Sequence, residues 1–246
     1  MIETESGLIY YLPNIKGWEN FPFKKRLEKK IGTPVAIDND ANVTALAELT
    51  RGKARNNKRA VVLTLGTGLG CGLILDGRVF HGTASAAEAG HIALSLEGPV
   101  CGCGARGCVE TFLGSRYFIK KAKALFRHYG HPLKRARDFT PEDLYYLALK
   151  RNRAALKSWE YYGHVLGRFC CGLINLLNLE KIILGGGLSK AHRFFKPRME
   201  KTIRTQAMRP LNRQVTIEIS TFGDDLGIIG AFELAKKDYA RRSIHR

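Results

Sequence analysis

Four residues at metal-ligand spacing lie in one short segment near the middle of the chain. They are arranged as H-x9-C-x-C-x4-C, and they are His91, Cys101, Cys103 and Cys108. Three thiolates and one imidazole form the Cys3His type of structural zinc site, a closed tetrahedron with no position left for water. Such a set seldom arises from ordinary packing. The sequence therefore predicts a structural Zn²⁺ ion that holds this loop in shape.

The same segment is rich in glycine and is flanked by two carboxylates. Glu88 precedes the histidine by three residues, and Glu110 follows the last cysteine by two. A zinc ion that fixes the loop also fixes the directions of Glu88, His91 and Glu110. We therefore expect the loop to present polar groups to a ligand.

Size and composition indicate a globular protein. The chain has 246 residues, of which 45% are hydrophobic, enough for one large or two small domains with a normal core. It contains no run of about 18 apolar residues, and residues 1–20 lack the layout of a signal peptide. Cys170 and Cys171 lie in an apolar helical pattern, where buried and inert thiols are expected. We therefore expect a protein of the reducing cytoplasm that does not associate with a membrane.

The formal net charge of +18 raises the possibility of nucleic-acid binding, because clustered Lys and Arg release counterions when they contact phosphates. In this chain the basic residues form no single stripe. They are spread over 24–30, 51–59, 116–137, 150–157, 193–213 and 241–246. This distribution favours a solvated basic surface over a nucleic-acid footprint.

Alternating strand and helix patterns predict an α/β fold. Asp76–Gly77 is typical of a type I′ hairpin turn, and residues 53–58 form a polar connector that is a candidate hinge between two lobes. The strand patterns are 34–37, 60–65, 71–75, 181–184 and 215–220, and the helical patterns are 21–31, 41–50, 111–129, 141–177 and 225–237.

Asn39 and Asp40 lie between a predicted strand and a predicted helix, at the position where ligands bind in open α/β sheets. Asp40 has two interpretations. It could be only the N-cap carboxylate of its helix, or it could be a proton acceptor of modest basicity, since a helix N-terminus favours the ionised form.

Two glycine-rich turns follow predicted strands. The turn Gly66–Gly70 is followed by a strand, so it is neither a dinucleotide fingerprint nor a P-loop. It is a tight turn whose N–H groups and Thr67 hydroxyl can surround phosphate oxygens, although the motif taken alone favours a plain structural turn. Gly185–Gly187 is either a contact for adenine or ribose or a place where the backbone needs room.

These motifs resemble those of the ROK family (repressors, open reading frames and sugar kinases), which has the hexokinase and actin-like ATPase (ribonuclease H-like) fold. They occur in the family's order over most of the chain. The matching segments are IDNDAN at 37–42, LGTGLG at 65–70, EAGH at 88–91, CGCGARGCVE at 101–110 and ILGGG at 183–187.

The resemblance implies glucokinase-like, ATP-dependent phosphorylation of a hexose bound between two lobes, with Mg²⁺ as a cofactor and a homo-oligomer as the assembly. It makes Asp40 the base for the sugar hydroxyl, and it makes His91 a zinc ligand that also contacts sugar. The other implied sugar-binding residues are Asn39, Glu88 and Glu110; Gly66, Thr67 and Gly68 would lie at the phosphates, and Gly186 and Gly187 beside the adenosine.

The chain departs from the family pattern at its start. Residues 1–30 contain no match to the Asp-x-Gly-Gly-Thr turn that supports Mg²⁺ and the transferred phosphate in the family. We therefore expect residues 1–54 to be a partial N-terminal lobe, with 226–246 as a candidate helix to pack on it, and residues 55–225 to be a complete C-terminal lobe. Such a chain is expected to expose a sheet edge and to retain sugar binding better than turnover.

Two other functions remain open at this stage. One is a sugar-responsive transcription repressor of the same family, and the other is a sugar-binding remnant without catalysis. No helix-turn-helix pattern is recognisable in the sequence, so direct nucleic-acid binding is the less favoured hypothesis.

Overall fold

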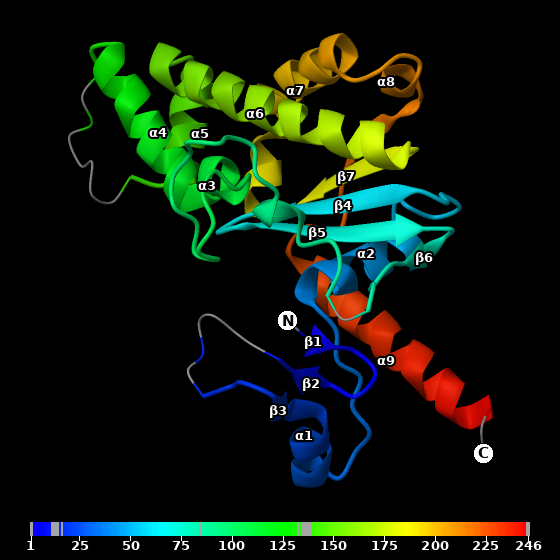
Figure 1. The fold of residues 1–246 in the computed structure, drawn as a ribbon. Helices are drawn as coiled ribbons and strands as arrows, with labels where there is room; N and C mark the ends of the chain where they lie inside the picture. The colour runs from blue at the N-terminus through cyan, green and yellow to red at the C-terminus, as the bar shows by residue number, and fades with distance from the viewer. Residues whose placement is uncertain are drawn as a thin grey trace.

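A mixed five-stranded sheet lies at the centre of the computed structural model, with helices on both of its faces (Figure 1). The structure describes residues 2–10, 15, 17–83, 85–131, 133 and 139–244. The strand order is β6-β5-β4-β7-β8; β4 pairs antiparallel with β5 and parallel with β7. The strands are β4 (Ala60–Leu65), β5 (Leu69–Leu75), β6 (Arg78–Val79), β7 (Lys181–Gly185) and β8 (Thr216–Ile219). This arrangement confirms the predicted α/β class.

Alternate residues of β4 face two different hydrophobic cores. Val61 and Leu63 belong to the larger core beneath the upper helices, whereas Ala60 and Val62 belong to a small core on the opposite face. The period of two follows from strand geometry. Because both faces are buried, the strand appears in the sequence as a continuous apolar run.

The upper helical layer packs around a cluster of buried aromatic rings. Phe118, Trp159, Tyr162 and Phe195 are all fully buried, and each lies within 6.1 Å, between ring centroids, of another member of the cluster. The helices of this layer are α3 (Glu110–Leu113), α4 (Ser115–His128), α5 (Pro141–Leu149), α6 (Arg153–Leu177), α7 (His192–Gln206) and α8 (Leu211–Gln214).

Two predicted helices are each divided in the structure. The helix predicted over 141–177 is interrupted because Arg151 has a φ of 57° and the side chain of Asn152 caps a new helix. The helix predicted over 111–129 is broken at Gly114, whose backbone is extended. Local apolar periodicity continued across both breaks and therefore concealed them.

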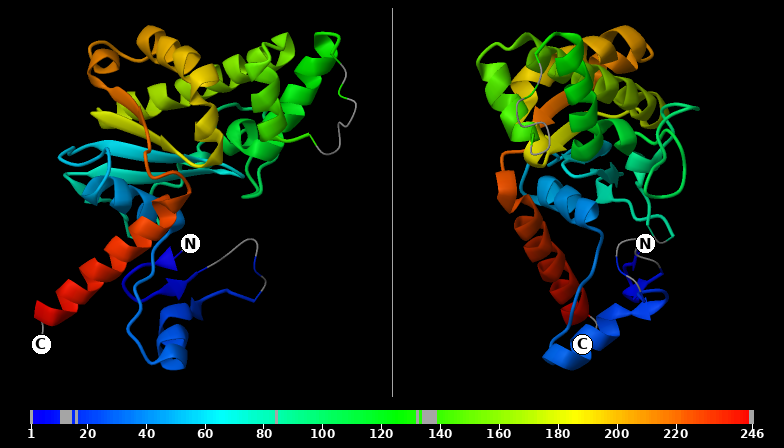
Figure 2. Two further views of the ribbon diagram at one scale, coloured as in Figure 1. Left: turned by 180° about the vertical axis from the view of Figure 1, so that it is seen from behind. Right: turned by 90° about the vertical axis from the view of Figure 1, so that its left-hand side faces the viewer.

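The lower layer consists of α2 (Asp40–Thr50) and α9 (Leu226–Ile244), and Figure 2 shows α9 extending away from the sheet. The two helices cross closely at Gly230, where a Cβ atom would collide with the backbone of Val43. An ion pair joins them, with 2.5 Å between Arg51 Nε and Glu233 Oε1. None of the described helices is long and apolar enough to cross a membrane.

A small N-terminal unit lies below these layers. It has an antiparallel three-stranded sheet of β1 (Ile2–Glu3), β2 (Leu8–Ile9) and β3 (Phe21–Pro22), followed by α1 (Phe23–Ile31). Arg242 of α9 reaches this unit, with 3.4 Å between its Nη2 and Glu28 Oε1. The proposed lobe boundary after residue 54 stays a prediction.

The strand predicted at residues 34–37 does not form. Within the described residues this segment pairs with no other strand, and its side chains are exposed or half-buried. An apolar β-prone run becomes a strand only when a neighbouring strand accepts its hydrogen bonds, which the sequence of the run alone does not reveal.

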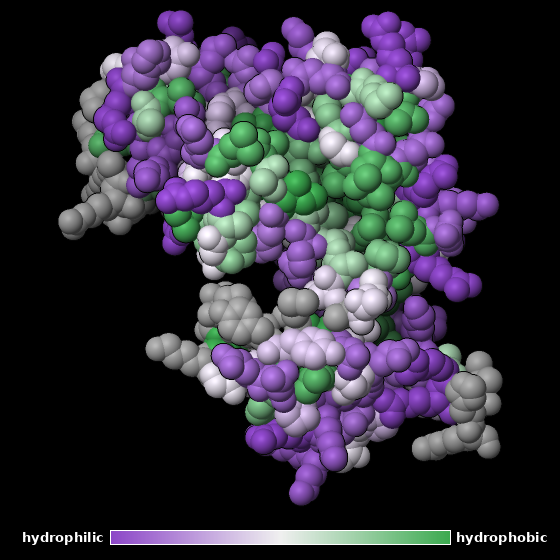
Figure 3. Space-filling model, viewed as in Figure 1, coloured by the Kyte–Doolittle hydropathy of each residue, from purple (hydrophilic) through white to green (hydrophobic). Residues whose placement is uncertain are grey.

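Hydrophilic residues cover much of the outer helices and of the N-terminal unit on the face seen in Figure 3, while apolar residues gather near the middle of that face. Some large apolar side chains are exposed, and Ile228, Phe232 and Tyr239 of α9 are 72%, 58% and 75% exposed.

The aromatic cluster gives a direct test of the core. Replacing the fully buried Phe195 with Ala should lower the free energy of unfolding by about 3–5 kcal/mol, because it removes a large side chain and leaves a cavity. The neighbouring half-buried Phe194 offers a matched control, and F194A should cost clearly less. Urea denaturation measures both, and equal losses would show that the cluster is not the centre of the core.

Candidate functional site

The predicted sugar and phosphate residues line one cavity of about 410 Å³. They come from stretches of sequence that lie far apart, and the fold brings them together where β4 and β5 meet the start of α2 (Figure 1). The predicted residues that line it are Asn39, Asp40, Gly66, Thr67, Gly68, Glu88, His91, Glu110 and Gly186. Gly187, by contrast, lines an adjoining cavity.

The first turn of α2 presents Asn39 and Asp40 to this cavity. Asn39 is the N-cap, and its Oδ1 accepts a hydrogen bond from Ala41 N at 2.8 Å. Asp40 is the first residue of the helix and is exposed. Asp40 Oδ1 also accepts from Ala41 N, at 2.8 Å, so the two side chains share this amide while Asp40 lines the cavity.

The glycine turn between β4 and β5 is held in place from two sides. Gly66 N donates to Gly68 O at 3.1 Å, and Gly66 O accepts from Ser115 N at 3.0 Å. Within the described part of the chain, the amides of Thr67 and Gly68 donate to no protein acceptor, and Thr67 is exposed. Two donors and a hydroxyl are thus available for an anion at this turn.

Glu110 lies against the glycine turn. It is the first residue of α3, and its Oε2 accepts a hydrogen bond from Leu69 N at 3.2 Å. The absence of a side chain at Gly68 makes this approach possible, because a Cβ there would collide with the Glu110 carboxylate. The turn and the carboxylate are therefore fitted to each other.

Glu88 and His91 reach the cavity from the short helical turn η1 (Ala89–His91). His91 N donates to Glu88 O at 3.0 Å, and Ser85 Oγ donates to Glu88 Oε1 at 3.2 Å. The chain then forms the cysteine-containing loop, which is closed by two isolated bridges, Ala93 with Cys108 and Val100 with Arg106.

The four predicted zinc ligands converge. Their ligand atoms all lie within 4.8 Å of one another. The separation from Cys101 Sγ to His91 Nδ1 is 3.5 Å, and that from Cys103 Sγ to Cys108 Sγ is 3.7 Å. A regular tetrahedron with the usual Zn–N and Zn–S bond lengths has edges of about 3.6 and about 3.8 Å. The site therefore fits a four-coordinate Zn²⁺ ion.

The thiols of this cluster differ in their environment. Burial, and after it the hydrogen bonds with Cys103 and Cys101, raises the pKa of Cys108 to about 12. A backbone hydrogen bond from Ala105 instead lowers the pKa of Cys103. A buried thiolate at position 108 therefore needs a cation beside it, which a zinc ion supplies.

A second cavity of about 630 Å³ adjoins the first and shares Gly66 and Thr67 with it. Its walls are more apolar and include aromatic rings from α5 and α6. Among its lining residues are Tyr145, Tyr146, Trp159, Gly187, Leu188 and Lys190. Of these only Gly187 was predicted, because no spacing in the sequence connects α5 with the glycine turn.

Metal content tests the cysteine-containing loop. Wild-type protein should contain about one zinc ion per chain, and C103S should lose most of it because a tetrahedral site needs all four ligands. Cys103 is exposed, so this substitution does not disturb the core. The control C171S alters a buried thiol of α6 and should keep its zinc. Elemental analysis of purified protein measures all three, and equal zinc in C103S and wild type would exclude this ligand set.

Known proteins of two kinds resemble the chain in sequence. Glucokinase from Halalkalibacterium halodurans is 35% identical over 243 residues, which cover 96% of this chain and 73% of the relative. The xylose repressor from Caldicellulosiruptor bescii is 28% identical, and the match covers 97% of this chain and 61% of the repressor.

Solved structures show the same two kinds. A ROK family glucokinase from Streptomyces griseus, in complex with glucose and AMPPNP, superimposes with a TM-score of 0.85 at 26% identity, over 96% of this chain and 78% of that one. A ROK family transcriptional regulator, a homolog of the E. coli MLC protein, also gives 0.85, at 29% identity, over 96% of this chain and 60% of that one. The model of the ROK family matches residues 1–238. The chain therefore belongs to the ROK family and has its actin-like ATPase fold.

Proposed function

We propose that this chain is an ATP-dependent hexose kinase of the glucokinase type. The observation that carries the proposal is the junction of the two cavities at Gly66 and Thr67. A phosphate at this turn would have the polar cavity with Asp40 on one side and the aromatic cavity on the other. Support also comes from the glucokinases among the relatives.

The polar cavity suits a sugar. Asn39, Glu88 and Glu110 would hold its hydroxyl groups through amide and carboxylate hydrogen bonds. In the cluster, Nδ1 of His91 faces Cys101 Sγ, so Nδ1 would bind zinc and leave Nε2 for the sugar. The zinc ion would thus orient a sugar-binding group without taking part in the reaction.

Asp40 would accept the proton of the reacting sugar hydroxyl as its oxygen bonds to the terminal phosphorus of ATP and the bond from that phosphorus to the bridging oxygen breaks. The products would be a sugar phosphate and ADP. The free amides of Thr67 and Gly68 would hold phosphate oxygens during transfer. Positioning of this kind supplies most of the catalysis in phosphoryl transfer.

ATP would place its nucleoside in the aromatic cavity, beside Gly187 and Tyr145. Gly186 has a φ of 81° and lies close against the backbone of Leu65. It lines the polar cavity, and the next residue, Gly187, lines the aromatic one. Mg²⁺ neutralises phosphate charge in such reactions. Apart from the zinc-type cluster, the described residues contain no set of three or more ligand side chains for one ion. Mg²⁺ would therefore be bound mainly through phosphate oxygens and water.

A sugar-responsive transcription repressor is the second candidate function. It is supported by the repressors and the dual regulator among the relatives, whose identities of 28–29% are close to the 28% of two Streptomyces glucokinases. In that case the polar cavity would bind sugar as a signal. The cytoplasmic location and the homo-oligomeric assembly expected from the resemblance stay proposals.

Replacing Asp40 tests the kinase proposal. A coupled assay should show hexose-dependent ATP consumption by the wild-type chain, although at a rate below that of an ordinary hexose kinase because residues 1–30 contain no Asp-x-Gly-Gly-Thr turn. D40N should reduce that kcat by about 10²–10⁴-fold more because the proton acceptor is lost. Calorimetry should show that D40N still binds hexose. The control D76N changes a carboxylate in the β5–β6 turn, where Asn also tolerates a positive φ, and should keep full activity.

The other outcomes separate the alternatives. Hexose binding by the wild-type chain without ATP consumption would contradict the kinase proposal and favour a regulator or a sugar-binding remnant. The absence of hexose binding at any concentration tested would contradict every function built on the polar cavity.

A further inference from the structure

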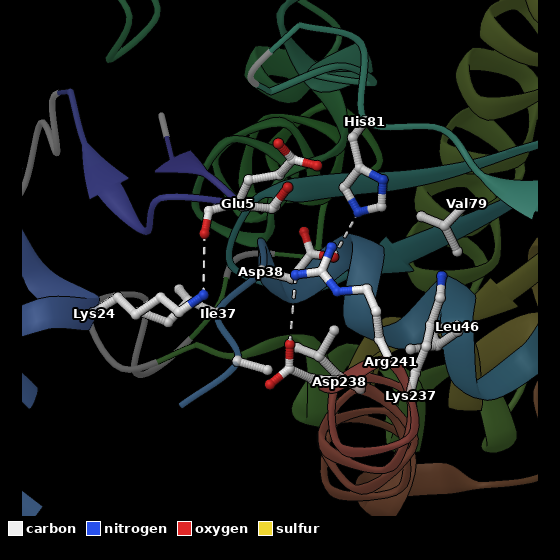
Figure 4. A pocket seen from close by; sticks show the side chains of 13 residues that line it. Glu5, Lys24, Ile37, Asp38, Leu46, Val79, His81, Lys237, Asp238 and Arg241 are labelled. Atoms are coloured by element: carbon white, nitrogen blue, oxygen red, sulfur yellow. Dashed lines mark hydrogen bonds and ion pairs between the residues drawn. The ribbon is translucent and has the colours of Figure 1, made fainter. Parts of the chain in front are cut away.

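An ion pair joins the residue before the N-cap of α2 to the loop that follows β6. Its members are Asp38 and His81, with 2.6 Å between His81 Nε2 and Asp38 Oδ2 (Figure 4). The Asp38 side chain is only 5% exposed and that of His81 29%. The pair lines a separate cavity of about 240 Å³ rather than the proposed sugar site.

The second oxygen of Asp38 is bound to the first turn of α2. Asp38 Oδ1 accepts from Asn39 N at 2.7 Å and from Asn42 Nδ2 at 2.9 Å. Both oxygens of the carboxylate therefore have partners. The two partners of Oδ1, Asn39 and Asn42, precede and follow Asp40 in the sequence. This fixes the backbone that carries Asn39 and Asp40.

His81 is in turn bound to the loop that carries Glu88. Its carbonyl oxygen accepts a hydrogen bond from Ala86 N at 2.9 Å. The preceding residue, Phe80, donates its N–H to Leu73 O of β5 at 2.8 Å. His81 thus stands where the loop leaves the sheet, seven residues before Glu88 and ten before His91.

We propose that Asp38 and His81 form a clamp that sets the separation between the two walls of the sugar site, one carrying Asn39 and Asp40 and the other Glu88 and His91. Both are positioning residues, because neither lines the polar cavity. The proposal deepens the function given above and rests on it for the identity of the ligand.

Charge makes the clamp dependent on pH. The hydrogen bond to Asp38 is the largest influence on His81 and raises its pKa above the ordinary 6.5, although burial and Lys237 of α9 oppose this effect. The stabilisation of the clamp by the charged pair is therefore complete below about pH 6.5. It is lost as the pH rises through the higher pKa that His81 has in the folded state. The other charged side chains lining the cavity around the pair are Glu5, Lys24, Asp238 and Arg241.

Nuclear magnetic resonance of the sugar-free protein tests the clamp without any need for activity. The His81 ring should titrate above 6.5, and the amide signals of Asp40 and Glu88 should shift with the same midpoint because both walls respond to the pair. In D38N the His81 midpoint should fall. The proposal would be overturned if His81 titrated at its ordinary pKa, or if the amide signals of Asp40 and Glu88 did not shift as His81 titrates.

Variants test the consequence for sugar binding. H81Q keeps a hydrogen-bond donor and loses the charge. It should weaken hexose binding about three- to tenfold at pH 6 and abolish the weakening that the wild type shows toward pH 9. The value of kcat should fall much less than in D40N, since the Asp40 carboxylate itself is retained. The control H164Q changes a half-buried histidine that is 3.2 Å from Thr202 Oγ1, between α6 and α7, and should leave affinity and its pH profile intact.

A purely structural role predicts a different result. In that case H81Q would lower the melting temperature and leave the pH profile of hexose affinity as in the wild type, which would contradict the clamp. If the wild type bound no hexose, the proposed function would fail, whereas the resonance experiment would still decide whether the pair couples the two walls.

Discussion

The convergence of His91, Cys101, Cys103 and Cys108 is the constraint on which the site depends. Between the histidine and the last cysteine the chain forms no helix or strand, and two isolated bridges with a few backbone hydrogen bonds hold its shape. Ordering such a loop costs conformational entropy that few apolar contacts offset here, so a bound metal would supply the missing stabilisation. Because Glu88 and Glu110 flank the ligands, the same ion would determine where both carboxylates point.

The sheet supplies the second half of the arrangement. Since β4 is parallel to β7, their carboxyl ends lie at one edge, and the glycine turn after β4 lies beside Gly186. The small residues of α2 allow that helix to pack on the same strands and to bring Asn39 and Asp40 to this edge. A polar cavity and an aromatic cavity therefore meet at Gly66 and Thr67, as transfer of a phosphate between two ligands requires.

Features encoded by neighbouring residues could be predicted from the sequence. The strand at 60–65 was found from its apolar run, and the Asp76–Gly77 turn is confirmed by positive φ values at both residues. The convergence of His91 with the three cysteines could be predicted because their spacing is local. Features that depend on distant partners were missed. Tyr145 shares a cavity with the glycine turn only through packing of α5, and His81, which belongs to no motif, has its partner 43 residues away.

Hexose binding measured by calorimetry on the zinc-loaded and the zinc-free protein tests the central claim most directly. If the metal aligns Glu88, His91 and Glu110 toward Asp40, affinity should fall at least about tenfold when zinc is removed and should return when zinc is restored. Equal affinity in the two states, with the protein folded in both, would contradict the claim that the metal organises the sugar site.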